Sequence, residues 1–238
     1  MRHDLAILLA ATLVSYPLGL AIGHPWLLPA LNALPAYIVL VPRLRKGERG
    51  GAVRAMLWWA LALALVGTLA FVFWPSPLDR VVVNGPEYRE EMFRWIRTGV
   101  GREGNPRLFL PQHLLHLAAF VAIGLASVSA GAILMGALLM NQMSFYVASL
   151  AKAGVPAWAV IFLGWQPWAI ARVAAFSTLG VLLAEPLLFR LYPAARDRLK
   201  GSKGAAYVMA AMSGILLDWF LKALLAPLWG RWLRGLLP

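Results

Sequence analysis

The chain has 238 residues, of which 61% are apolar and only 13% are charged, and its formal net charge is +12. An average soluble domain carries about 25% charged residues, so this composition excludes an ordinary soluble protein, a disordered chain and a small disulfide scaffold. Cysteine is absent, which excludes disulfides, thiolate metal ligands and cysteine nucleophiles. The composition is typical of a polytopic membrane protein with short loops.

The first apolar stretch, residues 5–41, contains no Asp, Glu, Lys or Arg. A spanning helix needs about 20 apolar residues, so the stretch predicts one span and a tighter second one. The break falls at residues 23–25, because Pro25 disfavours helix in the residue before it. Alternatively, Arg2 and the apolar run that follows could be a cleaved signal peptide. Asp4 and the polytopic character of the rest favour a retained span.

A basic segment follows at residues 42–54, with five Lys or Arg against the single Glu48. Short loops rich in Lys and Arg remain on the cytoplasmic side, so we expect this loop there. The next span is predicted at residues 55–74. Tryptophans near both of its ends, Trp58 and Trp74, mark the two membrane interfaces.

The only sizeable polar segment is residues 75–111, where six Arg are balanced by five acidic residues. Its balanced charge places this loop outside, opposite the basic one. Within it, residues 86–98 carry an amphipathic stripe at helical spacing, formed by Tyr88, Met92, Trp95 and Ile96. We expect a short helix that lies on the outer membrane surface or caps the bundle.

Residues 108–151 form a second long stretch without charges before Lys152. Two arrangements fit its length: one long helix to about Asn141 followed by an interfacial turn, or two spans that turn near residues 127–131. The segment 155–165 is too short to cross a membrane by itself. Residues 168–189 predict a further span.

A second basic segment, residues 190–203, has five Lys or Arg against Asp197 and should also be cytoplasmic. The last span is predicted at 204–225, followed by an interfacial helix from Pro227. The fold class is therefore an all-α transmembrane bundle of about seven spans, with six to eight allowed, in a single domain over residues 1–238. We expect a bacterial or archaeal cytoplasmic membrane with the N-terminus inside.

Ionisable groups inside spans are costly and usually have a function, a structural partner or both. Four occur here, and Asp218 and Lys222 can pair along one helix because they are four residues apart. Arg172 is expected in the same half of the bilayer as Asp218, so those two could pair instead. Polar interruptions add to a predicted polar pathway or substrate-binding site, which comprises Arg172, Asp218, Lys222, Glu185, Asn141 and Gln166.

A second group of residues has metal-ligand chemistry on the expected outer side: His24, His113, His116, Glu90 and Glu91. His113 and His116 share one helix face because they are three residues apart. The Glu pair followed by Arg94 is similar to the glutamate-pair pattern of CAAX-processing intramembrane proteases. Two residues instead of three separate Glu91 from Arg94, and the pair lies in a polar loop, so no family is assigned. A metal ion is an option here, and the cofactor stays undetermined.

Three functions fit this sequence. The sequence contains no coherent set of catalytic residues, so enzyme activity is undecided and the balance is against it. First is a non-catalytic scaffold, assembly component or small subunit of a membrane complex. Second is a small-solute or ion transporter that uses Arg172 and Asp218. Third is a metal-dependent intramembrane hydrolase that uses the His/Glu group. The expected partners are the lipid bilayer and proteins bound through helix 86–98 or the small-residue face of Gly124, Ser127 and Gly131, with no nucleic acid.

Overall fold

In a computed structural model, which describes residues 2–75, 78–200 and 204–237, the described chain forms ten helices and no strands. Seven of these helices are long and apolar enough to cross a membrane. They are α1 (Arg2–Ile22), α2 (Leu27–Arg45), α3 (Arg49–Phe73), α5 (Pro106–Ala126), α6 (Ala130–Lys152), α8 (Pro167–Leu191) and α10 (Gly204–Arg234). The prediction of an all-helical chain with about seven spans is confirmed to this extent.

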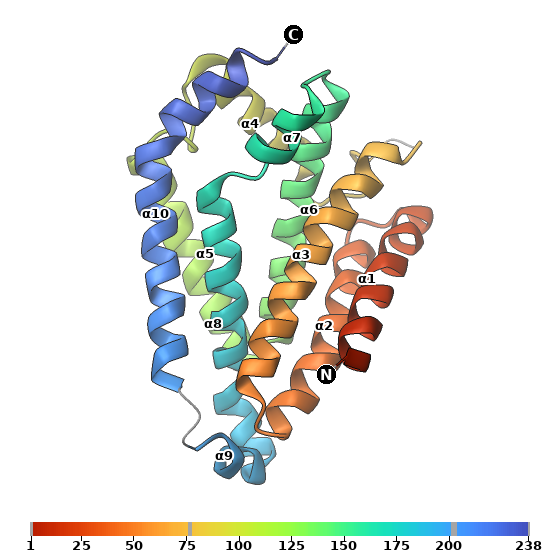
Figure 1. The fold of residues 1–238 in the computed structure, drawn as a ribbon, viewed down its shortest axis with the longest axis vertical. Helices are drawn as coiled ribbons and strands as arrows, with labels where there is room; N and C mark the ends of the chain where they lie inside the picture. Colours follow the sequence, from red (N-terminus) through yellow and green to blue (C-terminus); the bar gives the residue numbers. More distant parts are fainter. Residues whose placement is uncertain (1, 76–77, 201–203, 238) are drawn as a thin grey trace.

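Three shorter helices lie at the two ends of the bundle: α4 (Gly85–Thr98), α7 (Ala157–Leu163) and α9 (Pro193–Leu199). Figure 1 shows α4 and α7 at the end where the chain terminates, and α9 at the opposite end. We call these the α4 end and the α9 end. The seven residues of α7 do not cross the bundle, as the sequence predicted for 155–165.

The two basic segments meet at the α9 end. An Arg198 guanidinium N–H donates to the Arg45 carbonyl at 3.0 Å, and the Arg45 guanidinium lies 4.2 Å from the ring centre of Tyr192. The described part of both segments therefore lies on one side, as expected, whereas residues 201–203 lie outside the described residues. The predicted loop 42–54 is wrong in extent, because α2 runs to Arg45 and α3 begins at Arg49. Gly47 permits this tight turn with a φ of 83°.

The chain turns at residues 127–129, between α5 and α6, so the two-span alternative for 108–151 is confirmed. Val128 and Ser129 adopt left-handed backbone angles there. The Ser129 hydroxyl donates to the Gly180 carbonyl of α8 at 2.5 Å, and the Ser127 hydroxyl accepts from the Gly131 N–H at 3.0 Å. The Ser127 bond satisfies the Gly131 N–H, which lies in the first turn of α6 and has no partner within that helix. The Ser129 bond joins the turn to α8.

The two surfaces expected to bind protein partners are largely occupied by the chain itself. Met92, Trp95 and Ile96 are buried, because α4 lays its apolar stripe on α6 and α10 and caps the bundle. At Gly124, a Cβ would lie 3.0 Å from a methyl carbon of Leu183, so this glycine serves close packing of α5 on α8.

The C-terminal segment differs from the expectation. The predicted span ends near residue 225, but α10 is one helix of 31 residues that continues through Pro227 to Arg234. Figure 1 shows its last turns leaning over the α4 end. The Trp229 indole N–H donates to the Leu163 carbonyl of α7 at 2.8 Å, so these turns pack on the bundle instead of forming an independent helix. Packing of these turns on α7 and α4 keeps the helix continuous.

A buried polar cluster joins α1, α2 and α6. The Tyr16 hydroxyl donates to the side-chain oxygen of Asn141 at 2.9 Å, and Asn32 donates to the same oxygen at 3.0 Å. Ser15 bonds Asn32 at 2.6 Å. The first helix therefore supplies part of the polar core.

Candidate functional site

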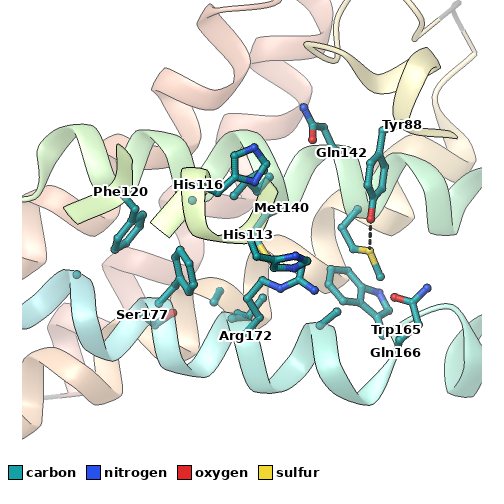
Figure 2. A pocket seen from close by; sticks show the side chains of 18 of the residues that line it. Tyr88, His113, His116, Phe120, Met140, Gln142, Trp165, Gln166, Arg172 and Ser177 are labelled. Atoms are coloured by element: carbon teal, nitrogen blue, oxygen red, sulfur yellow. Dashed lines mark hydrogen bonds between the residues drawn. The ribbon is translucent and has the colours of Figure 1, made fainter. Parts of the chain in front are cut away.

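A cavity of about 180 Å³ lies among α3, α5, α6 and α8. Its polarity changes along its length. Towards the α4 end it is lined by Tyr88, Glu91, Arg102, Glu103, Gln112, His113, Gln166, Arg172 and Lys222. Towards the α9 end it is lined by Leu40, Met56, Trp59, Phe120, Ala132, Ile133, Gly136 and Phe176. Figure 2 shows this order, from Phe120 and Ser177 through the histidines and Arg172 to Trp165, Gln166 and Tyr88.

Arg172 and Asp218 form a bidentate ion pair between α8 and α10. The guanidinium Nε and Nη2 donate to the two carboxylate oxygens at 3.0 and 2.9 Å. Asp218 is only 1% exposed, so it depends on this partner for compensation of its charge. The interhelical pairing that the sequence left as one of two options is the one observed.

Lys222 pairs with a residue that the sequence did not single out. Its ammonium group donates to Glu103 Oε2 at 2.7 Å, and the Trp168 indole N–H donates to Glu103 Oε1 at 2.8 Å. Burial acts to raise the pKa of Glu103, but the charges of Lys222 and Arg172 outweigh burial and lower it below its ordinary value. Glu103 therefore stays an anion that neutralises Lys222 at the cavity wall.

The connection between α4 and α5 is what carries Glu103 to this position. Gly99 ends α4 with a φ of 74°, a left-handed angle at which glycine meets little strain. Asn105 begins α5, since its side chain accepts the Arg107 backbone N–H at 3.0 Å. The few residues between these two caps turn back over the bundle. Residues 101–104, Gly-Arg-Glu-Gly, therefore form a turn that carries a largely buried carboxylate, that of Glu103.

Two histidines of α5 line the cavity. His113 Nδ1 lies 2.8 Å from the Phe109 carbonyl, so Nδ1 carries a proton and donates it. Its Nε2 has no hydrogen-bond partner in the described chain, and the closest acid, Asp218, is 3.8 Å away. His116 lies one turn further towards the α9 end and faces the same space (Figure 2).

Tyrosines close the cavity near α4. The Tyr88 hydroxyl lies 3.5 Å from the Met143 sulfur, and Gln166 lies at the same distance from the Tyr146 hydroxyl. Burial, together with nearby carboxylates, raises the pKa of Tyr88 well above its ordinary value. Tyr88 therefore remains a neutral hydrogen-bond donor. Gln166 is in the cavity wall, as the predicted polar site would require.

Two members of the predicted polar site lie elsewhere. Asn141 belongs to the α1–α2–α6 cluster and does not line the cavity. Glu185 lies nearer the α9 end and accepts two bonds from the Arg49 guanidinium of α3, at 2.5 and 2.7 Å. Arg49, predicted as part of a cytoplasmic loop, is 7% exposed in this pair. Of the six predicted residues, Arg172, Lys222 and Gln166 line the cavity and Asp218 pairs with Arg172, whereas Asn141 and Glu185 make contacts elsewhere.

The predicted metal-ligating residues are not brought together. The described residues contain no group of three or more His, Asp or Glu side chains arranged to hold a metal ion. His24 is exposed in the turn between α1 and α2. Glu90 lies 3.9 Å from Arg89, and Glu91 lies 3.3 Å from Arg102. Glu91, His113 and His116 line the same cavity without forming such a group, whereas His24 and Glu90 lie outside it, so the metal-dependent hydrolase gains no support from this arrangement.

Sequence reasoning missed Glu103, Trp168 and the cavity role of Tyr88. Glu103 lies in a short Gly-rich turn, where a carboxylate usually faces solvent. One signal was present, because Lys222 in an apolar helix requires a counter-ion. Asp218 was the nearest acid in sequence, and it was taken as that counter-ion.

Together, the fold and the cavity define an all-helical bundle with seven candidate spans and a partly open polar site bounded by ion pairs. Comparison with protein families, curated proteins and solved structures finds no match. The function must therefore be inferred from the geometry of this chain alone.

Proposed function

We propose that the protein is a small transporter or permease that takes up its solute in the cavity between α3, α5, α6 and α8. The observation that carries this proposal is the position of two buried ion pairs on one helix. Arg172 and Glu185 of α8 pair with α10 and α3, respectively. They are 13 residues apart, about 20 Å along a helix, and the cavity wall on α8 runs from Gln166, past Arg172, to Gly180, short of Glu185.

Two such pairs can serve as alternating closures. Opening at the α4 end would require α8 and α10 to separate at Arg172 and Asp218. Opening at the α9 end would require α3 and α8 to separate at Arg49 and Glu185. Buried ion pairs that exchange between two arrangements are a common element of conformational switching, and breaks such as Gln166-Pro167 allow α8 to tilt at its start.

The scaffold function ranked first from the sequence because no coherent catalytic set was evident and because helix 86–98 was expected to lie on the membrane surface. A scaffold does not require a cavity whose polar end is bounded by three ion pairs. A transporter requires a binding site of this kind. The apolar face of α4, the main feature in favour of a scaffold, is covered by α6 and α10. These two observations move the preference to transport.

The location that accompanies this function is the cytoplasmic membrane of a bacterium or archaeon. The basic residues Arg45 and Arg198 at the α9 end would face the cytoplasm, with α4 on the opposite side. The N-terminus would then lie inside, since α1, α2 and α3 alternate in direction.

The absence of native cysteine makes a direct test available. Ser177→Cys places a single thiol within the cavity with almost no change in size. In right-side-out and inside-out vesicles, a membrane-impermeant maleimide should label this thiol from both sides. Thr98→Cys at the α4 end and Asp197→Cys at the α9 end are controls, each labelled from one side only. Leu65→Cys, on the exposed apolar surface, should resist labelling.

Labelling of Ser177→Cys from one side only would show an open binding site without transport. Labelling from neither side would favour the scaffold function. The controls exclude leaky vesicles, because leakage would expose Thr98→Cys and Asp197→Cys equally from both sides.

A further inference from the structure

The charges at the polar end of the cavity are already balanced. Three cations lie there, and each has its own carboxylate: Arg102 with Glu91 at 3.3 Å, Arg172 with Asp218 at 2.9 Å, and Lys222 with Glu103 at 2.7 Å. A charged headgroup would have to break one of these pairs or leave a net charge within the membrane. Both are costly, so the site favours an uncharged ligand.

Two further hydrogen-bonding groups of the cavity are uncharged. His116 of α5 and Ser177 of α8 are partly exposed, line the cavity and have no hydrogen-bond partner in the described chain. The neighbouring Thr178 donates to the Ala174 carbonyl at 2.9 Å, the usual arrangement for a hydroxyl within a helix, which Ser177 does not share. Figure 2 shows Ser177 near Phe120, and His116 between Phe120 and His113.

These two groups match a hydroxyl. A neutral imidazole has one donor and one acceptor nitrogen, and a serine hydroxyl can do both. A ligand hydroxyl also donates and accepts, so it could bridge α5 and α8 without any charge. Arg172 uses Nε and Nη2 for Asp218, which leaves Nη1 available for a second ligand oxygen.

Beyond Ser177 the cavity becomes apolar. Phe120 and Phe176 pack edge to face with ring centres 4.7 Å apart. Trp59 presents only carbon to the cavity, because its indole N–H donates to the Asn32 carbonyl at 2.9 Å. Met56 and Met140 add flexible thioether chains that adapt to irregular ligands. This part of the cavity suits a hydrocarbon chain.

The direction of the polarity change matches that of a lipid in one leaflet. The polar groups lie towards the α4 end, and the apolar wall extends from there towards the α9 end. A lipid of the α4-side leaflet has its headgroup at that side and its chain towards the bilayer centre. A molecule could therefore enter without inverting.

From these observations, we infer that the ligand of the cavity is an uncharged amphipathic alcohol. Its hydroxyl headgroup lies between His116 and Ser177, and its single apolar chain extends towards Trp59. The inference rests on the proposed function, because it names the substrate class of the same cavity.

The test uses the full chain in nanodiscs and a 1-hexadecanol analogue with a photoreactive diazirine on its chain. Illumination should label peptides of α5, α6 and α8. Unlabelled 1-hexadecanol should displace this probe at about tenfold lower concentration than hexadecanoate, because the carboxylate of hexadecanoate would add an unbalanced charge to the site. Glycerol, a headgroup without a chain, should not displace it.

Matched variants locate the bound alcohol. His116→Phe should weaken binding about fivefold through loss of a hydrogen bond, and His116→Gln should restore most of it. Leu115→Phe, on the exposed side of the same helix, is the control. Gly136→Leu should fill the apolar end, since a Cβ there would lie 3.7 Å from Trp59, whereas Ala118→Leu on the exposed surface should have no effect.

Two results would overturn the inference. Equal or better displacement by hexadecanoate would show that the site prefers an anion. Labelling that is insensitive to His116→Phe and Gly136→Leu would place the alcohol elsewhere. The failure of this inference can be distinguished from the failure of the transport proposal. If Ser177→Cys is labelled from both sides but the alcohol does not bind, the transport proposal stands and the ligand class is wrong. Alcohol binding with labelling from one side retains the ligand class alone.

Discussion

Lys222 Nζ lies 2.7 Å from Glu103 Oε2, so a lysine inside the last candidate span reaches a turn between α4 and α5. Asp218, one helical turn earlier on α10, pairs instead with Arg172 of α8. Adjacent turns of one helix thus connect to two different elements. The two pairs join α10, α8 and the α4–α5 connection at the same end of the cavity, and four predictions test this arrangement and the rest of the core.

Replacement of Glu103 by Gln should destabilise the protein at neutral pH and much less under acid conditions. The neighbouring cations hold the pKa of Glu103 below its ordinary value of 4.5, so its stabilisation is fully present above that value. The stabilisation is lost as pH falls through the lower folded-state pKa. Thermal unfolding of wild type and Glu103→Gln should therefore converge as the pH is lowered below about 4. A difference that is constant with pH would contradict the ion pair.

Asp218→Ala alone should destabilise the bundle strongly. Loss of one member of a buried pair leaves Arg172 uncompensated, at a cost of about 3–5 kcal/mol in the free energy of unfolding. The double variant Arg172→Met with Asp218→Leu removes both charges and should recover most of that loss. Chemical unfolding in detergent measures both. If the double variant were no more stable than Asp218→Ala, the pair would not explain the effect.

Tyr16→Phe tests the polar cluster of α1, α2 and α6. The Tyr16 hydroxyl can donate to two acceptors, Asn141 Oδ1 at 2.9 Å and the Leu63 carbonyl at 3.2 Å. Its removal should cost about 1–3 kcal/mol, because buried acceptors lose a partner. Tyr37→Phe, which removes a hydroxyl of only partly buried Tyr37 on α2, serves as control and should be near neutral.

Removal of the ion pair at the α9 end should change the accessibility of the cavity. Arg49→Met with Glu185→Gln eliminates both charges between α3 and α8. In the Ser177→Cys background, we expect faster maleimide labelling from the side of the α9 end and slower labelling from the other. Equal acceleration from both sides would indicate general loosening of the fold instead of a shift between two states.

The spans were predictable because helix length and apolar composition are local properties. The uncharged stretch 108–151 required a turn, and Ser127 and Ser129 lie at the position where it occurs. The basic segments containing Arg45 and Arg198 were correctly expected at one end. Boundaries were less predictable, since arginine at a helix end can stay helical and extend its charged group to a partner, as Arg49 does.

The site was only partly predictable, because pairing depends on contacts between distant segments. Arg172 and Asp218 were identified as a pair from their expected depth alone. Asn141 was assigned to the same pathway as a polar interruption of an apolar stretch, but it contacts Tyr16 and does not line the cavity. Depth along a helix follows from the sequence, whereas the direction that a side chain faces depends on which neighbours the helix packs against.

The sequence by itself determined that the chain is a bundle of apolar helices, where its spans lie, and which polar groups are too costly to be left without partners inside them. Only the tertiary structure decided that Glu103 neutralises Lys222, that Arg49 reaches Glu185, and that His116 and Ser177 line one cavity. The physical reason is that the preference for burial is a property of each residue. The partner that satisfies a buried charge is chosen by packing between helices far apart in the sequence.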